Sequence, residues 1–142
     1  MKAMISKSSF FALLLIQLFA LSCEHPPGAT VRYFFTIQNN SSSRILYFVN
    51  NDYPDISIPD SLSTEVRLVT LSSEENFKYE SSKKWPKYFN SLPADTLSIF
   101  FLSADTVSKY GWKQVQSRYL ILNRKDISLQ DLEDNKYLIT YP

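Results

Sequence analysis

The chain contains a single cysteine, Cys23, and a single histidine, His25, and the two lie almost next to each other. One cysteine cannot form an internal disulfide, so a folded domain must be held together by its core. One histidine in a Pro-rich segment excludes Cys/His zinc sites, Ser–His–Asp triads and Cys–His nucleophile pairs made by this chain alone. The only glycines, Gly28 and Gly111, are too few for a glycine-rich phosphate loop. We therefore predict no cofactor, no metal and none of the familiar hydrolase mechanisms.

The segment before Cys23 has the pattern of an export signal. Lys2 and Lys7 precede an apolar run, Phe10–Leu21, which only Gln17 interrupts. A transmembrane helix needs about 20 apolar residues, so this run is too short to span a bilayer. A positively charged start, a short apolar stretch and small residues near a cleavage point are typical of a secretory signal. The sequence therefore predicts an exported protein.

The residues around Cys23 suggest what its thiol does. Ala20-Leu21-Ser22-Cys23 resembles the bacterial lipobox, where signal peptidase II cuts before a cysteine that becomes acylated, although the best lipobox match has leucine in place of Ala20. The alternative is an ordinary signal peptide followed by an incidental cysteine. We predict lipidation at Cys23 and anchoring to a membrane through several acyl chains, because one chain alone binds only weakly. The expected organisation is a signal peptide over 1–22, a tether over 23–30 and one β-rich domain over 31–142.

Carboxylates are the remaining groups that could do chemistry. Paired acids hydrolyse glycosidic bonds, and Asp52 with Asp55 or Glu74 with Glu75 could form such a pair. Acids in turns and on surfaces are more often solvated, so we expect no enzymatic activity, with a carboxylate-dependent glycan hydrolase as the alternative. Oxygen-bearing side chains over residues 50–55 could also bind Ca²⁺. Asx turns explain the same residues without a metal, and they are the interpretation we prefer.

Charge and aromatic content limit the partners. Loss of Lys2 and Lys7 with the signal leaves a slightly negative mature chain without a basic stripe, so we expect no nucleic acid partner. Aromatic residues make up 15% of the chain, which is more typical of a β-sheet core than of a ligand platform. Three lysines near Trp85 could form a cationic binding patch, but a solvated loop with one buried aromatic is the preferred interpretation.

The N-terminal half of the domain shows strands by its alternation of apolar and polar residues. Val31–Asn39 and Arg44–Asn50 each place apolar residues on one face, and the polar cluster between them predicts a hairpin. Glu65–Leu71 is expected to form the next strand. The charged stretch Ser72–Asn90 has no clear pattern beyond one helical turn near Trp85.

The C-terminal half combines strands with short helices. Strands are predicted at Leu97–Leu102, which is apolar enough to be buried on both faces, and then at Tyr119–Asn123 and Tyr137–Tyr141. Short helices are expected after Ser103, at Trp112–Ser117 and after a capping box at Ser128. The fold class is mainly β, an antiparallel β-sandwich or open barrel of about six strands with short helical turns in the C-terminal half.

Several motifs resemble a known family. Tyr110-Gly111-Trp112, Ser128-Leu-Gln-Asp-Leu and the closing Ile139-Thr-Tyr-Pro142, together with Phe35-Thr-Ile37 and Tyr53-Pro-Asp55, are similar to those of small Bacteroides-type exported lipoproteins. The similarity covers most of the mature chain. It implies an exported, membrane-anchored protein of the outer membrane that faces the periplasm or the cell surface. It implies no activity, because the motifs consist of caps and core aromatics.

The same resemblance implies a modification. Bacteria of this kind attach O-linked glycans to Asp-(Ser/Thr)-aliphatic triplets of exported proteins, and three such triplets place candidate sites at Ser61, Thr96 and Thr106. The alternative is that these pairs serve only as turns and caps. The expected function is thus a membrane-tethered, noncatalytic binding or accessory domain. Its partners would be the membrane, through the lipid on Cys23, and an envelope protein or glycan.

Overall fold

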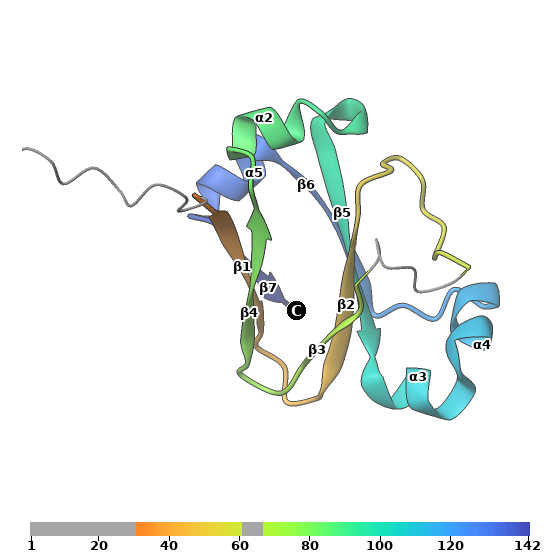
Figure 1. The fold of residues 1–142 in the computed structure, drawn as a ribbon. Coiled ribbons are helices and arrows are strands. Elements are labelled where there is room, and N and C mark those ends of the chain that lie inside the picture. Colours follow the sequence, from red (N-terminus) through yellow and green to blue (C-terminus); the bar gives the residue numbers. More distant parts are fainter. Residues whose placement is uncertain (1–30, 61–66) are drawn as a thin grey trace, which may run out of the picture. The chain divides into compact units, whose positions relative to one another are not determined.

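Two mostly antiparallel β-sheets dominate the fold, which a computed structural model describes for residues 31–60 and 67–142 (Figure 1). The described strands lie within one compact unit, Arg32–Pro142. One sheet has the order β4-β1-β7 and the other β3-β2-β5-β6. The predicted mainly β, sandwich-like class is confirmed. The described strands are β1 (Tyr33–Asn39), β2 (Ile45–Asn50), β3 (Val69–Leu71), β4 (Asn76–Ser81), β5 (Thr96–Ser103), β6 (Asn123–Ser128) and β7 (Leu138–Tyr141).

Short helices connect the later strands. The sheets are joined at one end by α2 (Trp85–Phe89) and α5 (Leu129–Asp134), while α3 (Ala104–Tyr110) and α4 (Trp112–Ser117) lie beside the four-stranded sheet (Figure 1). A 3-10 turn, η1 (Pro93–Asp95), precedes β5. None of the helices within the described ranges is long and apolar enough to cross a membrane.

The main core fills the space between the two sheets. In β1, Phe35 and Ile37 are fully buried while Phe34 on the other face is exposed, as the alternation predicts. Opposite them lie the inward side chains of β2 and β5, and α2 and α5 close one end with Trp85, Phe89 and Leu132. Because Trp85 is buried here, the three neighbouring lysines do not form an aromatic binding patch.

A second core lies on the other face of the four-stranded sheet. Phe48 of β2 stacks on Phe100 of β5 with ring centroids 4.7 Å apart, and Trp112 of α4 meets Phe48 edge-on. Val115 and Ile58 complete this cluster. The prediction that Leu97–Leu102 is buried on both faces is confirmed, because β5 lies between two cores. Arg44–Asn50, predicted to have one apolar face, is also buried on both faces over Ile45–Phe48.

The predicted hairpin between the first two strands is wrong. β1 pairs with β4 and β7, whereas β2 pairs with β3 and β5, so the connection crosses from one sheet to the other. Buried Asn39 holds this crossing. Its Nδ2 donates to the carbonyl oxygens of Ser43 and Ser72 at 2.7 and 2.9 Å, which ties the loop to the chain leaving β3.

Two further expectations need correction. The stretch without a clear pattern contains β4, where Phe77 and Tyr79 alternate with charged Lys78 and Glu80. Tyr119–Asn123 is not a strand: the next strand, β6, begins only at Asn123, and Tyr119 itself has a positive φ of 51°. The described residues contain seven strands in two mostly antiparallel sheets. The closing strand β7 pairs with β1 in parallel, while the other described strand pairs are antiparallel.

Local capping signals are confirmed. Ser128 accepts from the Asp131 amide, and the Asp131 carboxylate accepts from the Ser128 amide at 2.9 Å, so α5 begins with a complete capping box. The Ser128 hydroxyl also donates to the Asp131 carboxylate, and this bond together with that from the Ser128 amide lowers the pKa of Asp131 below its usual value. Ser103 caps α3 through the Thr106 amide. Gly111, at φ 74°, ends α3 in a conformation that favours glycine.

Candidate functional site

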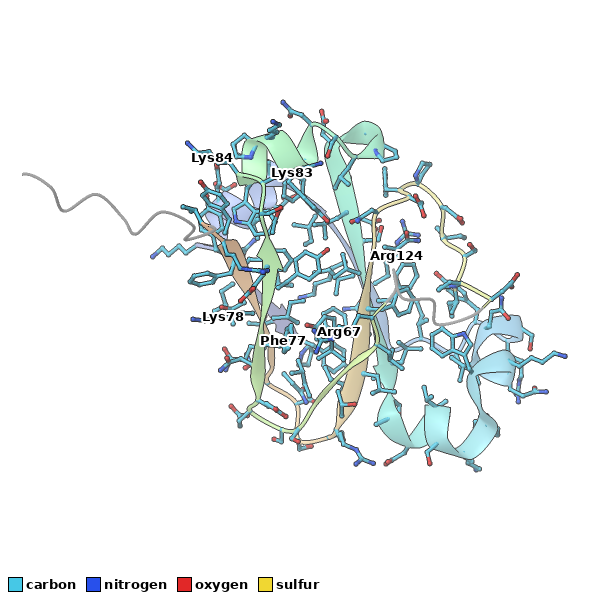
Figure 2. All side chains as sticks on the ribbon, in the orientation of Figure 1. Arg67, Phe77, Lys78, Lys83, Lys84 and Arg124 are labelled. Carbon is cyan, nitrogen blue, oxygen red and sulfur yellow. The ribbon has the colours of Figure 1, made fainter. Side chains whose placement is uncertain are left out.

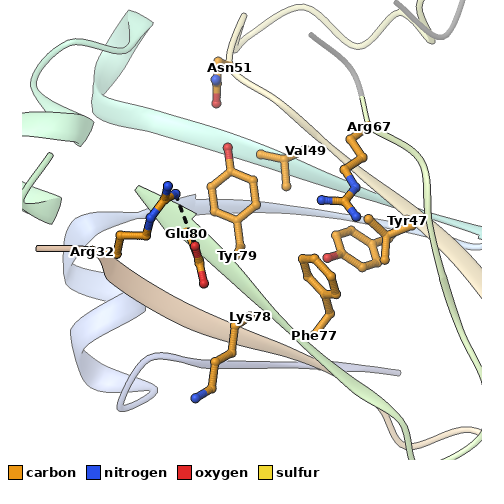
Figure 3. Close-up of a pocket in the computed structure, with 10 residues that line it drawn as sticks. Arg32, Tyr47, Val49, Asn51, Arg67, Phe77, Lys78, Tyr79 and Glu80 are labelled. Atoms are coloured by element: carbon orange, nitrogen blue, oxygen red, sulfur yellow. Dashed lines mark hydrogen bonds and ion pairs between the residues drawn. The ribbon is translucent and has the colours of Figure 1, made fainter. Parts of the chain in front are cut away.

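A cleft opens between the edges of the two sheets, where β4 faces β2 and β3 (Figure 3). Its volume of about 590 Å³ lies within the range of small-molecule sites. β3 pairs with Ile45–Tyr47 of β2, while β5 pairs with the other side of β2 as far as Asn50. Val49 lies beyond the described pairing with β3 and lines the cleft there. The lining residues are Arg32, Tyr47, Val49, Asn51, Arg67, Val69, Phe77, Lys78, Tyr79 and Glu80.

Aromatic and aliphatic side chains form the walls. Val49 and Val69 line the cleft from the four-stranded sheet, and half-buried Phe77 and Tyr79 line it from β4. The Tyr47 ring lies 6.3 Å from the Phe77 ring, centroid to centroid. The Tyr79 ring packs on the ring of buried Phe35, with centroids 5.0 Å apart, and this contact fixes the Tyr79 ring against the main core. These side chains give the cleft apolar patches beside its polar lining residues, and packing holds their aromatic rings in place.

Tyr47 carries the one buried side-chain polar atom without a hydrogen-bond partner among the described residues. The residue is 1% exposed, and burial raises the pKa of its hydroxyl despite the opposing effect of Arg67. The hydroxyl therefore keeps its proton and can donate. A buried donor without an acceptor costs about 1–3 kcal/mol, so this position is unfavourable unless something else accepts the bond.

The hydroxyls on the opposite side are satisfied by one another. Tyr88 donates to the Asn51 side-chain oxygen at 3.0 Å, and the Tyr79 and Tyr88 hydroxyl oxygens are also 3.0 Å apart. Because the single proton of Tyr88 is already donated, Tyr79 is the donor to Tyr88. Burial, and then the neighbouring Tyr88, raises the pKa of Tyr79. This hydrogen-bonded chain closes one end of the cleft.

The charged residues of the cleft differ in the groups that they contact. Arg32 and Glu80 form an ion pair, with Nη1 and Oε2 3.3 Å apart. The Lys78 ammonium lies 4.3 Å from the centre of the Phe34 ring. Since Phe34 is on the exposed face of β1, that ammonium points away from the cleft. The Arg67 guanidinium lies 5.3 Å from the centre of the Phe77 ring, inside the cleft mouth (Figures 2 and 3). Arg67 is therefore the lining cation whose charged group lies over a cleft side chain, the Phe77 ring.

The predicted carboxylate pairs do not contribute to this cleft. Asp52, Asp55, Glu74 and Glu75 are exposed in turns. Asp55 accepts from the amide and hydroxyl of Ser57, which lowers the pKa of Asp55, and Glu75 accepts from the Ser72 amide. The Asp55 contacts, and the Asp52 amide donating to Asn50 Oδ1, are turn interactions of the kind preferred over a calcium site at residues 50–55. Within the described ranges, no group of three or more His, Cys, Asp or Glu side chains could hold a metal.

The predicted modification sites are scattered. Cys23 and Ser61 lie outside the described residues. Thr96 begins β5, is half-buried, and donates to the Ala94 carbonyl oxygen at 2.8 Å. Thr106 is half-buried in the first turn of α3. Neither threonine lines the cleft, so the glycosylation hypothesis and the cleft concern separate parts of the fold.

Sequence reasoning missed the cleft residues because it missed β4. The alternation of Phe77 and Tyr79 was the available signal, and it would have placed both rings on the inward face of a strand. No neighbouring residue in the sequence identifies Arg67 as a cleft residue, because its contact is with the ring of Phe77 in β4. Comparisons with known protein families, with curated proteins and with solved structures find no match to this chain.

Proposed function

We propose that the mature chain is a membrane-tethered extracytoplasmic lipoprotein that binds a ligand without transforming it. The single observation that carries the binding role is the cleft between the two sheet edges, with a buried Tyr47 hydroxyl that lacks an acceptor among the described residues. The tethering role rests on the export pattern and on Cys23 in the sequence. The domain would be held at the outer membrane, facing the periplasm or the cell surface.

The chemistry of the cleft supports binding over catalysis. Glu80 is the one carboxylate among the described lining residues, and it is already paired with Arg32 and about half exposed. Hydrolysis of a glycosidic bond uses two carboxylates about 5–10 Å apart across the bond. Tyr47 and Tyr79 keep their protons, because burial raises the pKa of both, so neither serves as a base near neutral pH.

Tethering is tested by Cys23→Ser in the native host. The wild-type protein should incorporate labelled palmitate and fractionate with membranes, and the variant should lose the label and appear in the soluble fraction. Wild-type protein without label, together with a variant that stays membrane-bound, would contradict tethering through Cys23. Circular dichroism of the released variant serves as the control for its fold.

Binding in the cleft is tested with the released Cys23→Ser chain by ¹H–¹⁵N NMR. Amino acids, short fatty acids, aromatic acids and soluble glycans would each be titrated, and we expect at least one to shift the amides of Val49, Val69 and Phe77 saturably. Val49→Trp fills the cleft and should abolish these shifts, and Val69→Trp is a second blocking variant if the first folds poorly. Ligands that shift only amides outside the cleft, or that bind the blocked variants equally well, would overturn the assignment.

A further inference from the structure

We propose that the ligand of the cleft is a small carboxylic acid with an apolar body, with Arg67 and Tyr47 binding its carboxylate. The proposal rests on the proposed binding function and adds the chemical class of the ligand. It follows from the way in which donors, acceptors and apolar walls are distributed among the lining residues.

At the Tyr47 end of the cleft, the two polar side chains without a hydrogen-bond or ion-pair partner among the described residues are both donors. A tyrosine hydroxyl at the position of Tyr47 can give one hydrogen bond, and no described residue accepts it. A guanidinium group has five N–H donors and no acceptor, and that of Arg67 is placed over Phe77, with no acidic partner among the described residues. Arg67 is also close enough to Tyr47 to influence its hydroxyl electrostatically. Two neighbouring donors, one of them charged, favour an anionic acceptor.

The other polar groups do not compete for that acceptor. The Tyr79 hydroxyl donates to Tyr88 and the Arg32 guanidinium is paired with Glu80. Figure 3 shows Tyr79 and Asn51 on one side of the cleft and Tyr47, Phe77 and Arg67 on the other. The hydrogen-bonded hydroxyl of Tyr79 therefore lies toward one end of the cleft, and the Tyr47 and Arg67 donors lie at the other.

A carboxylate fits these donors better than a larger anion. Its two oxygens match the planar fork of arginine, and the second oxygen can accept from a neutral hydroxyl. Phosphate groups are usually bound by several cations or by backbone amides at a glycine-rich turn. This end of the cleft presents Arg67 as its cation, and Gly111, the glycine within the described residues, does not line the cleft.

The walls determine the rest of the ligand. Val49, Val69 and the Phe77 ring line the cleft next to the donors, and the Tyr79 ring continues this surface toward Asn51. An apolar ligand body on these side chains removes apolar surface from water, which stabilises the complex. A cavity of about 590 Å³ accommodates an aromatic or short aliphatic acid.

The test compares 3-phenylpropionate with 3-phenylpropionamide, which has the same apolar body without the charge. Both would be titrated into the Cys23→Ser chain and followed by ¹H–¹⁵N NMR. A charge-assisted hydrogen bond supports a preference for the acid of about tenfold or more in Kd. Amide shifts should centre on Val49, Val69 and Phe77.

Arg67→Gln should reduce the preference for the acid to less than about threefold while leaving the affinity for the amide unchanged. Tyr47→Phe should weaken acid binding about threefold to tenfold. Arg118→Gln is the matched control, because Arg118 also lies over an exposed aromatic ring, that of Tyr110, but far from the cleft residues in the fold. This control should keep the full preference.

Each outcome has a defined meaning. If the acid and the amide bind equally in the cleft, or if Arg67→Gln keeps the preference, the carboxylate inference is wrong and the binding function stands. If no compound of the wider panel binds in the cleft, both proposals are wrong. A preference that is lost in Arg118→Gln as much as in Arg67→Gln would show a general effect of charge and would also overturn the inference.

Discussion

The two faces of strand β2 carry similar aromatic residues, but one face is covered by helices and the other opens into the cleft. Phe48 points to the face that α3 and α4 cover, where Trp112 packs against it. Tyr47, its neighbour in the chain, points to the face that opens into the cleft. On the covered face the polar atom of the aromatic residue is satisfied, because Trp112 Nε1 donates to the Pro59 carbonyl oxygen at 2.9 Å.

On the open face the Tyr47 hydroxyl has no acceptor among the described residues. One face of β2 thus belongs to a covered core in which the Trp112 Nε1 group is hydrogen-bonded. The other face carries a hydroxyl without a hydrogen-bond partner among the described residues. The difference indicates that the sealed face serves stability and that the open face is available for binding. The following predictions test whether the two faces differ in this way.

The largest difference is expected from removal of a ring on each face. Phe100→Ala deletes a fully buried ring that stacks on Phe48, and such deletions cost about 3–5 kcal/mol of unfolding free energy. Phe77→Ala removes a half-buried ring at the cleft and should cost about 1 kcal/mol. Urea denaturation of both variants measures this. Equal losses would mean that the cleft wall is packed as tightly as the sealed core.

Loss of a polar group should change the unfolding free energy in opposite directions on the two faces. Trp112→Phe leaves the Pro59 carbonyl oxygen without its donor and should lower stability by about 1–3 kcal/mol. Tyr47→Phe removes a buried hydroxyl without a partner and should raise the stability of the ligand-free protein by about 1 kcal/mol. Thermal and urea unfolding without added ligand decide the sign. A destabilised Tyr47→Phe would show that the hydroxyl is already satisfied.

Alkaline pH should destabilise the open face. Burial raises the folded-state pKa of Tyr47 and of Tyr79 above the value of about 10 expected in the unfolded chain. The stability that this difference contributes is fully present below the unfolded pKa and is lost as pH rises through the folded pKa. Unfolding free energy should therefore fall above about pH 10.

The alkaline loss can be assigned to the cleft by mutation. Tyr47→Phe and Tyr79→Phe should each make the fall with pH shallower. Tyr110→Phe is the control, since Tyr110 is exposed and lies at the end of α3. An alkaline loss that Tyr110→Phe reduces as much as the cleft variants do would place the responsible tyrosines elsewhere.

The smallest expected effect on stability belongs to Arg67→Gln. Arg67 is exposed and forms no ion pair with another described residue, so its replacement should change unfolding free energy by less than about 0.5 kcal/mol. A residue that matters for binding but hardly for folding is what a ligand-binding surface requires. A loss above about 2 kcal/mol would identify Arg67 as a structural residue of the cleft mouth.

Features set by neighbouring residues could be predicted from the sequence. The capping box of Ser128 and Asp131 depends on residues three apart, and the burial of β5 on both faces is evident in its unbroken apolar run. The mainly β class also follows from such local patterns. Strand pairing does not, because the polar loop after Asn39 allows a tight hairpin or a crossing between sheets. The crossing depends on hydrogen bonds from Asn39 to residues more than 30 positions away.

One strand was misplaced and another was missed, because apolar content was a poor guide to strands in these two segments. Leu120 and Ile121 are apolar, yet they lie outside any strand and pack under the second core, while the more polar Asn123–Ser128 forms β6. In β4, Lys78 and Glu80 obscured the inward aromatics. The cleft itself needs the tertiary fold, since Arg67, in the segment before β3, meets Phe77 of β4 in the other sheet.

The parallel pairing of β1 with β7 has a consequence for the order in which the protein can be completed. Thr36 is matched with Leu138 and Asn39 with Tyr141, so the central strand of its sheet pairs with residues about 100 positions later in the chain. Until those residues are synthesised, β1 can pair only with β4, and an isolated two-stranded ribbon is marginally stable in water. This three-stranded sheet is therefore completed only once residues 138–141 have been synthesised and have paired with β1.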